Sequence, residues 1–407
     1  DKLKKNNKVR FIKPSEVINL QSKAFAGKKL ILSSPGQPIP VKKQDKYNIL
    51  RWAVTGRNDL LINTRCWKIY ESLNKSKKAK ESDWKELCFL WSSDFRTHIT
   101  DKRWKKYIKQ LTKMKKRWHK KDTYLNLGIH KPDENLKVKK NFDIQKKFSY
   151  RQIGRFLIIE NYRFKIKLNL RKGMAIDSFI DLNKSKKALF GTIDHGYFDD
   201  ISFGADYYSG HLVFEAPGKQ KVTDLTAVRP NINEYENGLQ VSANIKTQLG
   251  VIKKKWTIDM TNGSLILSYI LNWPHKIIGS MRLGNITMMP DTFNIKKFSY
   301  QVKNGGILNE KFNLFEEKYF NHGKTVSSLI SASQAIGITD GTIKLCDNRK
   351  SVNVTINKSQ AALVGLVSHI KIKDKVFTRL SFSAREVDDT SKASSFGLFK
   401  VDLKIST

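Results

Sequence analysis

The sequence predicts an α+β protein in which a helical segment precedes a large antiparallel β-sandwich. Apolar residues recur at helix spacing in the first third of the chain, and from about residue 145 they alternate with a period of two. Turn-forming pairs such as Asn262-Gly263 and Asp340-Gly341 separate the alternating stretches, with no helical interlude between them. We therefore expect an irregular lead-in at 1–45, a helical domain at 46–140 and a β-sandwich domain at 145–407.

Three segments carry the helical pattern. The first has apolar residues at helix spacing, namely Ile62, Cys66, Ile69, Tyr70 and Leu73. The second opens with Asp83 and Glu86, three residues apart, which resemble a capping box. The third has one apolar stripe, opposite a face of lysines, and the stripe consists of Trp104, Ile108, Leu111, Met114 and Trp118. Such a lysine face is usually solvated.

The alternating pattern of the second region is clearest where Phe164, Ile166, Leu168 and Leu170 alternate with polar residues. Similar stretches lie at 241–248 and 352–356. A chain of 407 residues exceeds the usual size of a single core, so two domains are the natural expectation.

Composition excludes several classes of protein. The chain is 40% hydrophobic and 11% aromatic, which is enough to form packed cores. It lacks an apolar run of about 18 residues, so we expect no membrane span. The three cysteines, Cys66, Cys88 and Cys346, form no C-x-x-C pair and predict a reducing, cytoplasmic location. Nucleotide-binding and zinc-protease motifs are missing, and we expect no cofactor.

The net charge is +39, from 76 Lys and Arg against 37 Asp and Glu. One interpretation is a polyanion partner such as nucleic acid or an anionic glycan. The other is a lysine-rich solvated surface. Lysines dominate, whereas recognition of phosphates and bases favours arginine, so the solvated surface is the preferred interpretation and nucleic acid the weaker one.

A loop at 47–59 combines aromatic, arginine and short polar side chains. Trp52 can stack on the C–H face of a sugar ring, while Arg57, Asn58 and Asp59 can bond its hydroxyls. Such a mixture suits a sugar better than a metal. The alternative is structural, with Asn58 or Asp59 capping the next helix and Trp52 in the core.

A second polar cluster comprises Asp94, Arg96 and His98. These side chains share a face if the segment is extended, and Asp94 and His98 share one if it is helical. His98 could donate a proton near neutral pH. The alternative is a structural Asp–Arg pair beside a hydrogen-bonded histidine.

A third cluster, at 194–211, contains His195, Tyr197 and several aspartates between glycines. Aspartate and histidine can bind a metal, and the same residues can form a sugar-binding loop. The spacing alone does not separate these two, and we assign no metal ligand.

Two segments make the sequence resemble a known family. The run Pro38-Ile39-Pro40-Val41, followed by Arg51-Trp52-Ala53-Val54-Thr55-Gly56-Arg57-Asn58, resembles the region after the catalytic barrel in glycoside hydrolase family 57. The segments at 62–67 and 91–100 are similar to the helices that follow that barrel. The β region is similar to the family's C-terminal sandwich, a galactose-mutarotase-like supersandwich, through pieces such as His195-Gly196-Tyr197.

The resemblance implies a role in carbohydrate chemistry. Members of that family are retaining glycosidases whose barrel carries two catalytic carboxylates. This chain has no βα alternation, so the resemblance implies that the catalytic pair lies elsewhere, on a barrel domain upstream or on a separate chain. We name no catalytic residue. The residues expected to contact a polysaccharide or oligosaccharide are Trp52, Arg57, Asn58, Asp59, Asn63, Trp91, Asp94, Arg96, His98, His195 and Tyr197.

Two functional hypotheses follow. In the first, the chain is the C-terminal, substrate-contacting part of a glycoside hydrolase or transglycosylase. In the second, it is a stand-alone binding module for an anionic glycan or nucleic acid. Salt separates them, because polyanion binding weakens steeply with ionic strength and neutral-sugar binding barely responds.

Overall fold

The computed structural model describes residues 12–13, 16, 51–95, 99–119, 148–198, 206–304, 309–315, 335–387, 391 and 393–407. Within these residues a group of helices precedes two large antiparallel sheets, as expected. The expected lead-in at 1–45 lies almost wholly outside the described residues. No helix in the described part of the chain is long and apolar enough to cross a membrane.

The helical unit packs around its own small core. It contains the π-helical turn η1 (Arg51–Thr55), helix α2 (Asp59–Lys75), helix α3 (Glu81–Leu90), the 3₁₀ turn η2 (Ser93–Phe95) and helix α4 (Asp101–Trp118). The apolar faces predicted for α2 and α4 are confirmed at Ile62, Cys66, Leu111 and Met114, which are fully buried, whereas Tyr70 of the predicted α2 face is exposed. The lysine face of α4 is exposed throughout.

The predicted capping box of α3 was wrong. The helix begins two residues before Asp83, and the residue that precedes its first turn is Lys80. The Asp83 carboxylate accepts a hydrogen bond from the backbone N–H of Lys80 at 2.9 Å, which is the role of the third helical residue. Glu86 points to another helix and binds Arg117 of α4 at 2.5 Å. The two acidic residues therefore stabilise the start of α3 and its packing on α4.

The first sheet has eleven strands, in the order β1-β2-β3-β4-β5-β12-β19-β18-β15, with β6 paired to β12 and β7 to β6. Their bounds are β1 Ser149–Ile153, β2 Phe156–Glu160, β3 Phe164–Asn169, β4 Ala175–Asp181, β5 Phe190–Gly191, β6 Val213–Glu215, β7 Val222–Thr223, β12 Ser280–Met288, β15 Ala335–Ile338, β18 Val364–Ile372 and β19 Lys375–Arg385. The predicted alternation in β3 is confirmed, since Phe164, Ile166 and Leu168 are buried. A 3₁₀ turn, η3 (Leu170–Lys172), follows β3.

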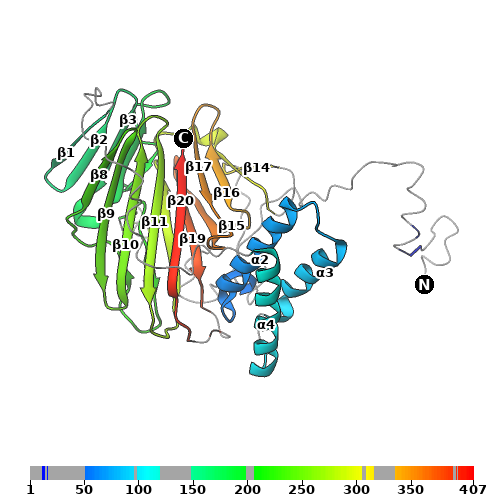
Figure 1. Cartoon of the computed structure of the whole chain (residues 1–407). Coiled ribbons are helices and arrows are strands. Elements are labelled where there is room, and N and C mark those ends of the chain that lie inside the picture. Colours follow the sequence, from blue (N-terminus) through cyan, green and yellow to red (C-terminus); the bar gives the residue numbers. More distant parts are fainter. Residues whose placement is uncertain are drawn as a thin grey trace.

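The second sheet has nine strands, in the order β14-β13-β16-β17-β20-β11-β10-β9-β8. Their bounds are β8 Asn231–Tyr235, β9 Gly238–Thr247, β10 Gly250–Asp259, β11 Ser264–Trp273, β13 Ser299–Val302, β14 Glu310–Asn313, β16 Thr342–Cys346, β17 Ser351–Ile356 and β20 Gly397–Ser406. A 3₁₀ turn, η5 (Ile295–Lys297), precedes β13. The two sheets stack face to face (Figure 1) and enclose one apolar core that includes Trp256, Trp273 and Phe179.

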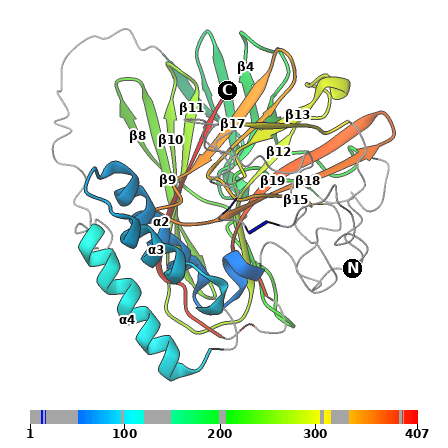
Figure 2. The ribbon, with the colours of Figure 1, turned by 90° about the vertical axis from the view of Figure 1, so that its right-hand side faces the viewer.

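The helical unit lies beside the sandwich and contacts it directly (Figures 1 and 2). The hydroxyl of Thr64 on α2 accepts a hydrogen bond from the N–H of Ala362 at 3.0 Å, and the carbonyl of Val54 in η1 accepts one from the N–H of Glu386 at 3.2 Å. Leu60 packs against the sandwich core. These contacts place the start of α2 at the end of strand β19.

Candidate functional site

Polar and aromatic groups gather on the outer face of β19, where Phe377 and Ser383 are buried and Arg379 is partly exposed. Leu380, Phe382 and Ala384 belong to the sandwich core. Because successive strand residues point to opposite faces, the odd-numbered positions from 377 to 385 point away from that core. At about 3.3 Å per residue, this outer face runs for roughly 30 Å from Phe377 to Glu386.

Aromatic rings occupy the end of the face near the start of β19. Phe377 contacts Tyr207 with ring centroids 4.7 Å apart, and Phe198 lies edge-on to Phe377 at 6.2 Å. Tyr197 packs on Phe198 at 4.8 Å, and its hydroxyl donates to Asp291 at 2.6 Å. Burial, followed by this hydrogen bond, raises the pKa of Tyr197, so the hydroxyl stays protonated.

Arg379 and His211 occupy the middle of the face. The Nη2 atom of Arg379 lies 3.4 Å from the Tyr208 carbonyl and 3.4 Å from Nε2 of His211. The other ring nitrogen of His211, Nδ1, lies 3.0 Å from the Tyr208 carbonyl and therefore carries the hydrogen. Burial, then the charges of Arg379 and Lys254, hold the pKa of His211 well below its usual value. The imidazole is neutral, and Nε2 is an acceptor.

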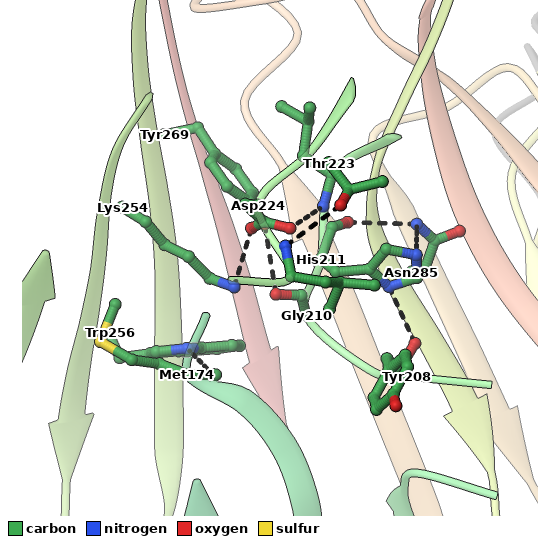
Figure 3. A network of polar contacts seen from close by, with 12 residues as sticks. Met174, Tyr208, Gly210, His211, Thr223, Asp224, Lys254, Trp256, Tyr269 and Asn285 are labelled. Atoms are coloured by element: carbon green, nitrogen blue, oxygen red, sulfur yellow. Dashed lines mark hydrogen bonds and ion pairs between the residues drawn. The ribbon is translucent and has the colours of Figure 1, made fainter. Parts of the chain in front are cut away.

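A buried polar network holds the segment that carries His211 (Figure 3). The carboxylate of Asp224 binds Lys254 of β10 at 2.9 Å and accepts from the Tyr269 hydroxyl of β11 at 2.9 Å. Its second oxygen accepts from the N–H of Leu212 at 2.9 Å. The three side chains are fully buried between the sheets. The nine-stranded sheet thus fixes the backbone at 210–212 from the inside, and His211 points to the other side.

The far end of the face contains a buried ion pair. Arg282 of β12 donates from Nε to Glu386 at 2.9 Å and from Nη2 at 3.3 Å. Ser383 donates to the same carboxylate at 2.7 Å, and Glu386 is fully buried. Three donors fix this carboxylate in position.

A cavity of about 80 Å³ opens beside this ion pair, between the helical unit and the sandwich. It is several times larger than the roughly 10–15 Å³ that one water needs. Residues 54–56 and 58–61 form one wall, and residues 278–279, 384–387, 391 and 394–396 form the other. Glu386, Arg385 and Phe396 contribute a carboxylate, a guanidinium and an aromatic ring.

Two of the residues predicted to contact a sugar, Asn58 and Asp59, line this cavity. Asn58 is exposed and adopts a left-handed backbone with φ of 55° at the start of α2. Asp59 is buried and accepts from the N–H of Gly56 at 2.7 Å. Arg57 lies outside the cavity wall, where it binds Asp101 at 2.6 Å and stacks over Trp104 at 4.6 Å. The side chain of Trp52 is outside the described residues.

The remaining residues predicted in the helical unit have structural contacts. Asn63 donates to the carbonyl of Ala53 at 2.7 Å and accepts from Trp91 Nε1 at 2.8 Å. Asn63 thereby ties η1 to α3. Asp94 is exposed and accepts from the Ser92 hydroxyl at 3.2 Å. Arg96 and His98 lie outside the described residues.

His195 and Tyr197 take different positions. His195 is exposed, and its N–H donates to Asp206 at 2.8 Å. Tyr197 belongs to the aromatic end of the β19 face. Within the ranges that the structure describes, no group of three His, Cys, Asp or Glu side chains is arranged to hold a metal ion.

Sequence reasoning included His211 in the third cluster but missed Arg282, Arg379 and Glu386. These three residues are up to 104 positions apart, and the pairing of β12 with β19 brings them together. The signal in the sequence was weak but present, because Arg282 and Arg379 lie inside strands whose other positions are mostly apolar or small.

No protein-family model matches this sequence, and no curated protein matches it. Among solved structures, the chain is similar to a 4-α-glucanotransferase from Thermococcus litoralis, with 9% identity, a TM-score of 0.37 and coverage of 86% of this chain and 50% of that one. It is also similar to a galactose mutarotase-like protein from Lactobacillus casei, with 8% identity, a TM-score of 0.37 and coverage of 62% of this chain and 99% of that one. A third is a family 36 α-galactosidase from Geobacillus stearothermophilus, with 8% identity, a TM-score of 0.38 and coverage of 64% and 41%.

The chain thus spans half the length of the glucanotransferase and less than half that of the α-galactosidase. By their names, all three structures are of proteins of carbohydrate chemistry. At TM-scores below 0.5 these likenesses carry no argument about function, and the proposal below depends on the residues of the site.

Proposed function

We propose that this chain is the carbohydrate-contacting and supporting part of a glycoside hydrolase or transglycosylase that acts on a polysaccharide, as in family 57, with the catalytic barrel supplied from elsewhere. One observation carries the proposal. A single outer face has aromatic rings at one end, a guanidinium and a neutral imidazole in the middle, and a fixed carboxylate beside a cavity at the other. Sugars are recognised by this combination of apolar ring faces and a few fixed polar groups.

The geometry favours binding over bond cleavage. A retaining glycosidase needs one carboxyl group that can donate a proton and a second that attacks, about 5–5.5 Å apart. Both carboxylates of the cavity are already engaged. Arg282 and Ser383 hold Glu386, and the N–H of Gly56 binds Asp59. We therefore assign no catalytic role to either carboxylate.

The test is titration calorimetry of residues 1–407 with a panel of neutral oligosaccharides. We expect Tyr207→Ala to weaken binding about tenfold, which corresponds to ~1.4 kcal/mol and is within the range of one aromatic contact. Asn58→Ala and Trp52→Ala test the cavity wall and the predicted loop in the same way. Tyr162→Ala is the matched control, because Tyr162 is an aromatic residue with 87% of its surface exposed and is not part of this face.

If Tyr207→Ala, Asn58→Ala and Trp52→Ala all bind the oligosaccharide with unchanged affinity, the assignment of the site is wrong. A panel in which no neutral sugar binds would overturn the proposal itself. Binding that disappears as salt is raised would favour the polyanion hypothesis instead.

A further inference from the structure

The middle of the eleven-stranded sheet has an unusual row of residues on its outer face. Five strands contribute directly paired positions to this row: Ser178, Gly191, Thr287, Arg379 and Ser368. All except Arg379 are small. The row therefore places only small residues on both sides of one guanidinium, and three of them carry hydroxyl groups.

Arg379 has a donor without a partner. Its Nη2 makes two contacts at 3.4 Å, to the Tyr208 carbonyl and to His211 Nε2. Its Nε is buried and makes no hydrogen bond to a described residue. Within the described residues no carboxylate contacts it, and the ring of Tyr207 lies 5.5 Å from the guanidinium carbon.

The neighbouring arginines are satisfied. Arg282 has the carboxylate of Glu386, and Arg385 donates to the carbonyls of Ile277, Ser394 and Ser395. Burial lowers the pKa of Arg379 to about 10, so the guanidinium is still charged at neutral pH. A buried charge without a counter-charge is unfavourable, and such groups are normally paired.

Thr287 supplies a second unsatisfied group at the same place. It lies directly opposite Arg379 on β12 and is fully buried, and its hydroxyl has no hydrogen-bond partner among the described residues. The neighbouring described charges cancel, since Lys254 is paired with Asp224 and Arg282 with Glu386, and His211 is neutral. In the described part of the chain, this point of the sheet therefore has one positive charge without a counter-charge and one hydroxyl without a partner.

We propose that Arg379 and Thr287 form a subsite for an anionic oxygen group on the carbohydrate that the outer face binds. The arginine supplies charge and the free Nε–H, and Thr287 supplies a hydroxyl donor. This proposal rests on the proposed function and narrows its substrate class to acidic glycans. The group can be the carboxylate of a uronic acid or the phosphate or sulfate of a substituted sugar.

Titration calorimetry with residues 1–407 tests the subsite. The probes are glucose, glucuronate, glucose 6-phosphate and glucose 6-sulfate, at matched ionic strength. We expect at least one charged probe to bind tenfold or more tightly than glucose. The best charged probe identifies the source of the anionic group.

Three variants connect the preference to the subsite. Arg379→Met removes the charge at similar length, and we expect it to abolish the preference for the charged probe. Thr287→Val is nearly isosteric and should weaken binding of that probe three- to tenfold without affecting glucose. Arg171→Met, at an exposed arginine outside the row, controls for the change in net charge and should bind as the parent does.

Two outcomes overturn the inference. If glucose binds and no charged probe binds more tightly, the subsite is wrong while the proposed function stands. If neither glucose, the charged probes nor neutral oligosaccharides bind, both are wrong. The parent-protein titrations alone decide between these outcomes, so a variant that fails to fold does not leave the question open.

Discussion

Glu386 connects three parts of the molecule. Its backbone N–H donates to Val54 of the helical unit, its carboxylate binds Arg282 of β12, and Ser383 of β19 donates to the same carboxylate. Because both charges of the ion pair are largely removed from water, the pair depends on both partners being present. The residue that lines the cavity therefore also contributes to holding the helical unit against the sandwich.

Glu386→Ala should destabilise the protein strongly, because it leaves Arg282 buried and unpaired. We expect a loss of about 3–5 kcal/mol in the free energy of unfolding, measured by urea denaturation. The matched control is Glu160→Ala, which breaks an ion pair with the half-exposed Arg151 and should cost less than about 1 kcal/mol. Equal losses in the two variants would contradict this account of the Arg282–Glu386 pair.

The buried His369 of β18 should make the free energy of unfolding depend on pH. Its Nδ1 lies 2.9 Å from the Thr378 hydroxyl, and its Nε2 contacts the Leu314 carbonyl. Burial lowers the pKa of His369 from 6.5 to about 4, so the unfolded chain binds the proton first as the pH falls. The contribution of His369 to the free energy of unfolding is fully present above pH 6.5. It is lost as the pH falls toward 4, by at most about 3 kcal/mol.

Urea unfolding at pH 7, 6, 5 and 4.5 measures this loss. His369→Gln should flatten the dependence between pH 6.5 and 4.5, a range that lies above the pKa values of the carboxylates Glu160 and Asp347, which are lowered. A variant with the same slope as the parent would show that the slope has another origin, such as the buried His211.

At the scale of elements, the local sequence pattern predicted helices and strands better than it predicted the residues of the site. The helix periods of α2 and α4 and the strand period of β3 are properties of neighbouring residues, and the structure has them. The error at Asp83 was also local, because a carboxylate can serve either before a helix or three residues inside it. The pairing of β12 with β19 is not local, and no spacing in the sequence indicates that Arg282 faces Glu386.

The segment at 208–212 depends on a close approach at Gly210. This glycine has φ of +74°, and a Cβ added there would lie 2.4 Å from the Trp256 ring. Its N–H donates to the Asn285 carbonyl at 2.6 Å, beside the irregular register of β12. Irregular strand pairing of this kind often redirects a side chain at a functional site. Here it admits the segment that carries His211.

Gly210→Ala should displace this segment. The control is Gly218→Ala, since Gly218 has φ of +65° but an added Cβ there would meet no atom within 4 Å. Gly218→Ala carries only the backbone strain, about 1 kcal/mol, whereas Gly210→Ala should lose about 1–3 kcal/mol more from the clash. Urea denaturation measures both, and the imidazole NMR signal of His211 should shift in Gly210→Ala alone. Matching stabilities would contradict the close-approach account.

For the whole molecule, the arrangement of the helical unit and the sandwich defines the site. The sequence predicted both parts and placed sugar contacts in each, at Asn58 and Asp59 and at Tyr197. It did not predict that strand β19 would connect the two parts of the site, with the aromatic cluster at one end and the cavity at the other. The position of the helical unit on the sandwich depends on contacts between distant segments, such as the hydrogen bond between Thr64 and Ala362.

A crystal structure of residues 1–407 soaked with the tightest-binding oligosaccharide tests the central claim most directly. The account predicts sugar density along the outer face of β19, with a ring against Tyr207 and polar contacts to Arg379. Ordered sugar elsewhere, with this face bare, would contradict it.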